Sequence, residues 1–334
     1  MKIVFMGSSD FSIPSLRELI ASGHEILAVV CQPDKPNGRG KKLEFSNMKK
    51  FALENNLKVL QYQKIRFEGV DELKTLNPDL IVVVSYGQIL SQEIIDIGKY
   101  GCINVHASLL PKYRGASPIV SAIMNGEEKT GVTIMRVALE VDAGNMLSKA
   151  ETPINQDETG GQLSNRLAEM GAKLLVKVVS DIELGNVSEE VQNENEATFT
   201  KMIKKEDLEL NFSDSAIRVH NKVRALCPAP ATFVVRGDEK IKIYETEVVE
   251  CDENIPFGTV ICSDRNEGIK IKCGKDAIKI LKLQAPGGKI LDYKNYLNGR
   301  KFWKKVCWDW VMKKLKMLFW IWNSKSFVRN KFLS

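Results

Sequence analysis

Short apolar runs alternate with amphipathic segments through the first half of the chain. In chain order the segments are KIVFMG at 2–7, SIPSLRELIAS at 12–22, EILAVVCQ at 25–32, SNMKKFALENN at 46–56, KVLQ at 58–61 and DLIVVVSYG at 79–87. Strands that alternate with helices are typical of an α/β domain with a parallel sheet and helices on both faces, the doubly wound or Rossmann-like architecture. Residues 80–84 are apolar without alternation, so we expect this strand at the centre of the sheet.

A long helix and a polar stretch mark the end of this first domain. Residues 158–185 carry apolar side chains at helical spacing, which predicts a helix that ends near Gly185. The charged segment that follows has no sustained period and predicts an interdomain linker at residues 187–207. We therefore expect the first domain to comprise residues 1–186.

The pattern changes after the linker. Ser213 is placed to cap a helix through SAIRVHNKVRAL at 215–226, which the Cys-Pro-Ala-Pro segment at 227–230 would stop. Short alternating strands follow, separated by glycines and charged residues. The sequence therefore predicts a second domain at residues 208–301, a small OB-like β-barrel.

Cysteine usage and the first residues bear on the compartment. The seven cysteines are scattered, and no two of them have the spacing typical of metal ligands. This distribution predicts free thiols in a reducing compartment and no metal site. The opening apolar run soon reaches Gly7, two serines and Asp10, which is too short for the core of a signal peptide. We therefore expect a cytoplasmic protein.

The net charge of +6 is unevenly distributed. Residues 1–208 carry 24 Lys and Arg against 28 Asp and Glu, whereas residues 209–334 carry 24 against 14. An acidic half beside a basic half suggests a polyanionic partner that meets one part of the molecule, although a solvated surface would have the same composition.

The densest candidate chemistry lies in residues 104–118. If this segment begins as a strand, Asn104 and His106 point to the same face. Acyl transfer from an amide-like donor needs a group that steadies an oxyanion, a group that manages the proton of the attacking amine, and a group that orients the second. Asn104 suits the first role and His106 the second, and Asp142, in a glycine-containing loop, suits the third. Taken alone, each could also be a structural residue.

The string N-x-H-x-S-L-L-P at 104–111, followed by Asp142 in a D-x-G context, resembles the signature of the folate-dependent formyltransferases. The resemblance implies that Asn104, His106 and Asp142 form the catalytic group. It also implies 10-formyltetrahydrofolate as the formyl-donating cosubstrate, with no metal. The residues implied to line the folate site are Ser108, Leu109, Leu110 and Pro111.

A basic, glycine-rich segment at 32–43 separates a predicted strand from a predicted helix. Flexible glycines around Arg and Lys suit a loop that orders against phosphates and the end of an RNA stem, although a solvated charged loop is the alternative. This segment and the opening MKIVFMGSSDFSIPSL resemble the methionyl-tRNA branch of the family. The residues expected to contact tRNA are Lys35, Arg39, Lys41 and Lys42.

The resemblance extends from Met1 to about Lys301 and implies transfer of a formyl group to the amino group of methionine on initiator tRNA. We expect a monomer without stable membrane insertion. Three rivals remain: formyl transfer to another small amine, hydrolysis of formyltetrahydrofolate, and RNA binding without catalysis. Whether His106 acts as a base or, protonated, as a stabiliser also stays open.

The tail at 302–334 is atypical of this family, because it carries all five tryptophans of the chain interleaved with lysines. It could be an adventitious extension, an RNA-contacting helix or a helix lying on a membrane surface. Its longest apolar run, residues 317–322, is too short to span a bilayer.

Overall fold

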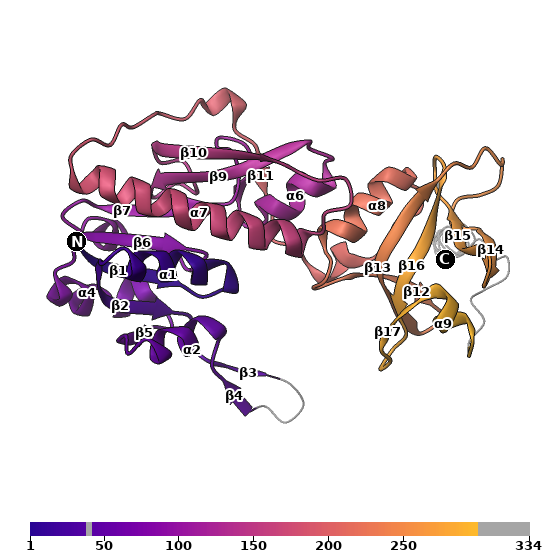
Figure 1. The fold of residues 1–334 in the computed structure, drawn as a ribbon, viewed down its shortest axis with the longest axis horizontal. Coiled ribbons are helices and arrows are strands. Elements are labelled where there is room, and N and C mark those ends of the chain that lie inside the picture. The colour runs from indigo at the N-terminus through magenta and orange to yellow at the C-terminus, as the bar shows by residue number, and fades with distance from the viewer. Residues whose placement is uncertain (38–41, 300–334) are drawn as a thin grey trace, which may run out of the picture. The chain divides into compact units, whose positions relative to one another are not determined.

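The computed structural model describes residues 1–37 and 42–299, which fall into two compact units (Figure 1). The first unit comprises Met1–Ala122 with Glu127–Ile203, and the second comprises Ile123–Gly126 with the described chain from Lys204 on. The tail at 302–334 lies outside the described residues. Each unit has its own sheet and its own core.

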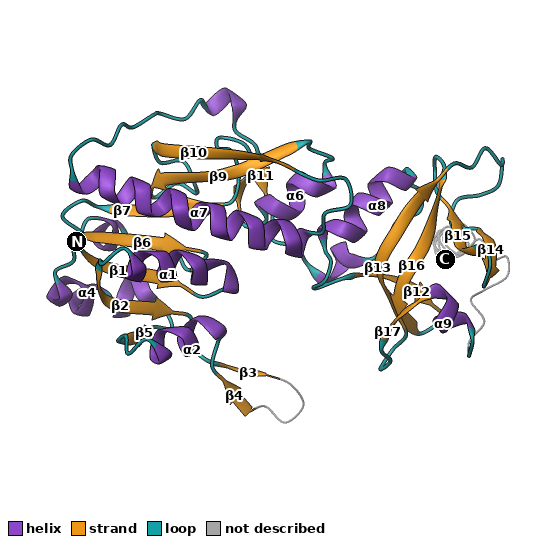
Figure 2. Ribbon diagram, viewed as in Figure 1, coloured by secondary structure: helices purple, strands orange, loops and turns teal. Residues whose placement is uncertain are grey.

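A seven-stranded sheet, in the order β10-β9-β7-β6-β1-β2-β5, is the framework of the first unit (Figure 2). Its strands are β1 (Lys2–Gly7), β2 (Glu25–Cys31), β5 (Val59–Gln61), β6 (Leu80–Val84), β7 (Cys102–His106), β9 (Lys129–Arg136) and β10 (Met146–Pro153). The five strands from β7 to β5 are parallel, and β9 and β10 extend the β7 edge antiparallel. The predicted α/β class is confirmed, with β6 fourth of the seven strands, but the sheet is mixed rather than wholly parallel.

Helices cover both faces of this sheet. They are α1 (Ile13–Ala21), α2 (Asn47–Glu54), α3 (Ile65–Glu68), α4 (Val70–Leu76), α5 (Gln92–Ile95) and α7 (Gly160–Glu183), with one 3₁₀ turn at Asp10–Ser12. A further helix, α6 (Pro118–Met124), lies between β7 and β9 in the chain. On one face, Val4, Met6 and Ile81 pack with residues of α4 and α5. On the other face, α7 packs against α1 and β9.

The long helix predicted at 158–185 is confirmed as α7. Thr159 caps it: the Thr159 side chain accepts from the backbone of Gln162, and the Gln162 side chain accepts from the backbone of Thr159. The apolar side chains of α7 form one stripe with a polar opposite face. None of the helices in the described ranges combines the length and the apolar character needed to cross a bilayer.

Two short strand pairs lie outside the main sheet. β3 (Lys35–Asn37) and β4 (Lys42–Glu44) form an antiparallel hairpin within the segment predicted as a loop. β8 (Arg114–Gly115) pairs in parallel with β11 (Phe199–Thr200). This second pair joins the segment after β7 to a stretch that the sequence pattern predicted as linker. Two 3₁₀ turns also lie in that stretch, at Glu194–Glu196 and Lys205–Leu208.

The second unit is built on a six-stranded antiparallel sheet in the order β12-β13-β16-β15-β14, with β17 on β16. Its elements are β12 (Thr232–Arg236), β13 (Glu239–Val249), β14 (Val260–Asp264), β15 (Gly268–Lys272), β16 (Ala277–Gln284), β17 (Ile290–Asp292), α8 (Ala216–Ala225) and α9 (Tyr293–Leu297). The predicted small second domain of short strands is confirmed, and its sheet is antiparallel. The prediction was an OB-like barrel, and among the described strands no backbone pairing joins β12 to β14.

The helix predicted after the linker is α8, but its cap differs from the prediction. Ser215, rather than Ser213, occupies the N-cap position, and the Ser213 hydroxyl donates instead to Asn211. Ser213 therefore stabilises the turn before the helix and does not cap it.

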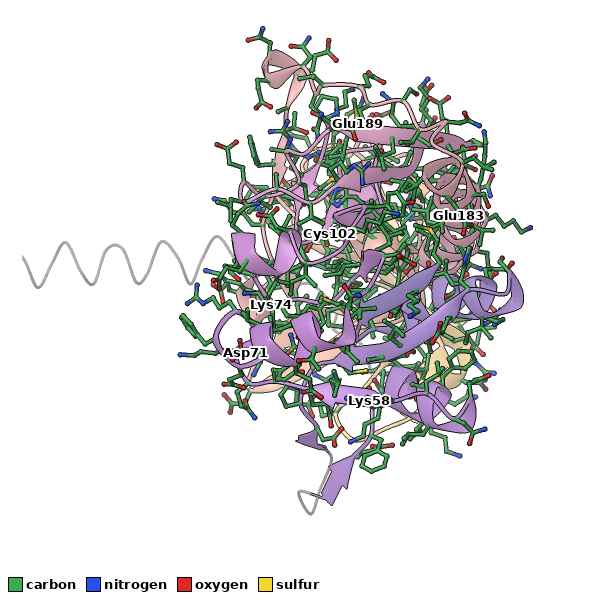
Figure 3. The ribbon with its side chains drawn as sticks, turned by 90° about the vertical axis from the view of Figure 1, so that its left-hand side faces the viewer. Lys58, Asp71, Lys74, Cys102, Glu183 and Glu189 are labelled. Atoms are coloured by element: carbon green, nitrogen blue, oxygen red, sulfur yellow. The ribbon has the colours of Figure 1, made fainter. Side chains whose placement is uncertain are left out.

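The six cysteines within the described residues are free thiols, as predicted. Cys102, at the start of β7, is buried among the side chains of the first unit (Figure 3). Burial raises the pKa of its thiol, so this side chain is an apolar core residue rather than a nucleophile.

Candidate active site

β7 carries the two central side chains of the site to the carboxyl edge of the sheet. It lies between β6 and β9, with Asn104 opposite Val83 on one side and Met135 on the other. Asn104 is the one residue of β7 that is not fully buried. Within the described chain its carboxamide makes no hydrogen bond, so the amide remains available to a ligand.

His106 is buried and is held at both ring nitrogens. Its Nε2 lies 3.0 Å from the carbonyl oxygen of Tyr113, and its Nδ1 lies 3.5 Å from Oδ2 of Asp142. A carbonyl only accepts, so Nε2 carries a proton. The second partner is a carboxylate that faces Nδ1, and the two side chains form an ion pair only when the ring is protonated.

Asp142 lies in the loop between β9 and β10, with a φ of 52°. Its Oδ2 accepts from the backbone N–H of Gly115 at 2.7 Å. Asp is among the residues that tolerate this left-handed region. Two residues later, a Cβ at Gly144 would lie 1.9 Å from the carbonyl oxygen of Arg136, so only glycine fits there. The D-x-G pattern thus has a steric cause, and the loop brings Asp142 to His106.

The predicted folate loop uses two of its four side chains to hold itself in place. Ser108 is fully buried, and its hydroxyl donates to the carbonyl of Lys112 at 2.6 Å. Leu110 is buried against Met135 and Met146. Leu109 and Pro111 are half-buried. A ligand at this loop would therefore meet backbone, Leu109 and Pro111 rather than the side chains of Ser108 and Leu110.

Sequence reasoning missed a threonine that fixes this loop. Thr133 of β9 is fully buried, donates to the carbonyl of Ser108 at 2.7 Å and accepts from the N–H of Leu110 at 3.1 Å. A threonine within the otherwise apolar run at 132–135 of β9 was the available signal. Arg114 and Gln192 were also missed, and both are buried polar side chains that bond each other, with Gln192 also bonded to the backbone of Asp142.

The basic segment of the chain is only partly described. Lys35 lies in β3 and Lys42 in β4, whereas Arg39 and Lys41 lie outside the described residues. At the base of the hairpin, Lys49 donates to Asp34 at 2.5 Å and to Gln61 at 2.8 Å. Burial would raise the pKa of Asp34, but the hydrogen bonds from Lys49 and Gln61 outweigh it and lower that pKa. Lys49 is therefore bound to Asp34 and Gln61 and stabilises the base of the hairpin.

Replacing Lys49 with methionine is expected to lower the free energy of unfolding by about 1–2 kcal/mol at neutral pH. The folded-state pKa of Asp34 is depressed, so the stabilisation is present above the ordinary carboxyl pKa of about 4 and is lost as the pH falls through the depressed value. Urea unfolding of both proteins between neutral and acid pH measures the difference.

Lys50→Met is the matched control, because Lys50 pairs with Glu44 on the exposed surface at 3.4 Å. It should change the free energy of unfolding by less than about 0.5 kcal/mol. Equal losses in the two variants, or a Lys49→Met loss that does not shrink in acid, would contradict the assignment.

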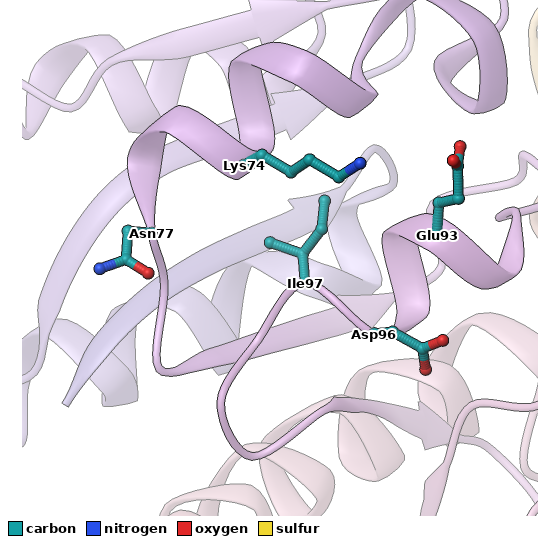
Figure 4. A pocket seen from close by; sticks show the side chains of 5 residues that line it. All are labelled: Lys74, Asn77, Glu93, Asp96 and Ile97. Atoms are coloured by element: carbon teal, nitrogen blue, oxygen red, sulfur yellow. The ribbon is translucent and has the colours of Figure 1, made fainter.

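A hollow of about 440 Å³ lies elsewhere in the first unit, lined by Lys74, Asn77, Glu93, Asp96 and Ile97 (Figure 4). These residues belong to the segments that precede β6 and β7, so the hollow is at the amino ends of the strands. Ligands of such sheets bind at the carboxyl ends. The hollow contains none of the predicted site residues.

Known proteins resemble this chain along nearly its whole length. A family model described as formyl transferase matches residues 1–179, and one described as formyl transferase, C-terminal domain, matches residues 202–301. The methionyl-tRNA formyltransferase of Clostridium botulinum (strain Alaska E43 / Type E3) is 44% identical, over 92% of this chain and 99% of its own. That of Sulfurihydrogenibium sp. (strain YO3AOP1) is 43% identical, over 90% and 97%.

Solved structures show a similar fold. WlaRD, a sugar 3N-formyl transferase crystallised with dTDP and 5-N-formyl-THF, aligns over 84% of this chain and 97% of its own, with a TM-score of 0.60 and 21% identity. The N-formyltransferase of Helicobacter canadensis, in complex with folinic acid and dTDP-3-aminofucose, aligns over 84% and 99%, with a TM-score of 0.60 and 21% identity. Both family models and the similarity along nearly the whole length show that the chain belongs to the formyl transferase family, in its methionyl-tRNA formyltransferase branch.

Proposed function

We propose that this protein transfers the formyl group of 10-formyltetrahydrofolate to the free amino group of methionine esterified to initiator tRNA, for translation initiation. The observation that carries the proposal is an Asn104 carboxamide that has no hydrogen-bond partner in the described chain and lies on the same strand as His106, which faces Asp142. Relatives named methionyl-tRNA formyltransferases support the acceptor. Neighbours crystallised with formylated folates support the donor.

The proposed reaction begins when the amine attacks the formyl carbon. A carbon–nitrogen bond forms, the carbonyl oxygen becomes an oxyanion, and the amide group of Asn104 donates a hydrogen bond to it. The bond to N10 of the folate then breaks, and N10 takes up a proton as it leaves. The amine nitrogen loses one proton in the same sequence.

The surroundings of His106 favour its protonated role over that of a base. Its Nε2 donates to Tyr113 and its Nδ1 faces Asp142, so neither nitrogen offers a lone pair to the amine. A protonated ring instead adds positive charge beside the developing oxyanion. We assign the amine proton to the Asp142 carboxylate, directly or through one water, because its Oδ1 has no hydrogen-bond donor within the described chain.

The folate is proposed to lie against the backbone of residues 108–111, with Leu109 and Pro111 as its apolar contacts. The tRNA is proposed to contact the basic segment at 32–43 through Lys35, Arg39, Lys41 and Lys42. We take the protein to act as a monomer in the cytoplasm, with folate and initiator methionyl-tRNA as its partners and no metal in the site.

Label transfer from formyl-labelled tetrahydrofolate tests the proposal. The purified protein is offered charged initiator methionyl-tRNA, free methionine, an amino-sugar nucleotide or water alone. Label in formylmethionyl-tRNA, and not in the other products, is the expected result. Label in an amino sugar or in free formate would overturn the assigned acceptor, and no transfer at all would overturn the enzymatic assignment.

Arg39→Ala is expected to weaken tRNA binding about tenfold while folate affinity stays unchanged. Losing one phosphate contact should also flatten the plot of log affinity against log salt by about one unit. Filter binding of methionyl-tRNA over a salt series measures both effects. Arg17→Ala, which removes an exposed arginine from α1, is the control and should change neither. An unchanged salt slope in Arg39→Ala would mean that Arg39 makes no phosphate contact and that the segment is a solvated surface.

A further inference from the structure

We infer that residues 189–200, a stretch predicted as linker, form a template that positions the catalytic loops, with Gln192 and Arg114 as its positioning residues. The inference rests on the proposed function for what the loops catalyse. The template itself is defined by contacts that hold the backbone around Asp142 and the backbone that receives His106.

Gln192 holds the loop of Asp142 through hydrogen bonds to the backbone of that loop. It is 5% exposed, and its Nε2 donates to the carbonyl oxygens of Asp142 and Gly144, both at 2.8 Å. Its Oε1 accepts from Nε of Arg114 at 3.0 Å. Both ends of the side-chain amide are therefore engaged inside the protein, and Gln192 reaches the chemistry only through Asp142.

Arg114 closes a ring of contacts around the site. Its side chain binds Gln192, and the next residue, Gly115, donates its backbone N–H to the Asp142 carboxylate. The ring thus runs from the Asp142 carboxylate through Gly115, Arg114 and Gln192 back to the Asp142 carbonyl. Glu194, on the same stretch as Gln192, accepts from both terminal nitrogens of Arg114, at 2.9 and 2.7 Å. This bidentate geometry fixes the guanidinium plane.

The same stretch fixes the backbone that receives His106. The Thr198 hydroxyl accepts from the N–H of Tyr113 at 2.8 Å, and the carbonyl of Tyr113 is the acceptor for His106. β11 pairs with β8 in a register that sets Thr200 opposite Gly115. A Cβ at Gly115 would lie 2.5 Å from the carbonyl oxygen of Thr200, so this close pairing requires glycine. Both partners of His106 are therefore held by residues 189–200.

The physical consequence is preorganisation. A buried amide that lacks a hydrogen-bond partner costs free energy, so the loop geometry in which Gln192 makes all its hydrogen bonds is more stable than other geometries of the loop. Displacement of a reacting group by about 1 Å can cost roughly a hundredfold in rate. Because Gln192 is buried and both ends of its amide are bonded inside the protein, its loss should act on kcat and leave both KM values nearly unchanged.

Gln192→Met tests the inference, since methionine keeps the length of the side chain and removes its hydrogen bonds. We expect kcat to fall about 10- to 100-fold, with both KM values within about twofold of wild type. Asn195→Met is the matched control: it places methionine on the same stretch at an exposed position and should retain wild-type kcat. A change in KM alone, or equal losses of kcat in both variants, would overturn the positioning role.

A double-mutant cycle distinguishes a positioning role of Gln192 from a general loss of structure. Added to Asp142→Asn, Gln192→Met should cost little further rate, because the side chain acts through Asp142. A full additional loss in the double variant would overturn that route.

Hydrogen exchange tests the template without any activity. Backbone exchange in peptides covering 113–117 and 140–146 should be faster in Gln192→Met than in Asn195→Met. Unchanged exchange would overturn the template whatever the protein catalyses, whereas faster exchange in a protein without formyl transfer would support the template and overturn only the proposed function.

Discussion

Asn104→Ala is expected to fold as the wild type does and to lose about a hundredfold to a thousandfold in kcat. The side chain extends from the one position of β7 that is not fully buried, and no residue of the described chain uses its amide. Truncation therefore removes no internal hydrogen bond and little core packing. In the proposed mechanism it removes the donor to the oxyanion, and this effect belongs to the transition state.

Asn104→Asp distinguishes an oxyanion donor from a packing role. Aspartate keeps the shape of asparagine but replaces the donor with a negative charge, so it should be at least as inactive as the alanine variant. Single-turnover rates at saturating folate and tRNA, with thermal unfolding measured in parallel, give the comparison. Recovery of activity in Asn104→Asp, or wild-type turnover in Asn104→Ala, would remove Asn104 from the mechanism.

The sequence pattern predicted those helices and strands whose buried residues form a simple, continuous pattern along the chain. β6 is buried along nearly its whole length and lies mid-sheet, and α7 presents one apolar stripe, so both left clear patterns in the sequence. The same reasoning could set Asn104 and His106 on one face, because strand side chains alternate. It could not indicate that β9 and β10 run antiparallel, since strand direction depends on where the chain returns.

Contacts between distant residues leave no periodic signal. Gln192 is one amide among many polar residues, and its partner Asp142 precedes it by 50 positions, so a polar run read as linker concealed a buried template. The prediction that Ser213 caps α8 was wrong for a related reason. Ser213 and Ser215 are both suitable in type, and only the backbone path decides that Ser215 stands at the N-cap. The residue types limit which side chains can fill such a position, and the tertiary structure determines which of them does.

Asp142→Asn is expected to keep the fold and to lose about a hundredfold to ten-thousandfold in kcat. Asparagine tolerates the φ of 52° at this position, and its amide oxygen can still accept from Gly115, so the loop should persist. The substitution removes the negative charge that faces His106 and, with it, the proposed acceptor for the amine proton, so the loss should fall on the reaction rather than on folding.

Asp142→Ala is the informative contrast to this variant, because alanine has no acceptor for Gly115 and is strained at positive φ. It should therefore lose stability, by about 1–3 kcal/mol, as well as rate. Thermal unfolding and kcat measured on both variants separate the two effects. If Asp142→Asn kept more than about a tenth of wild-type turnover, neither the negative charge nor a carboxylate acceptor for the amine proton would be needed, and the proposed role of Asp142 would be overturned.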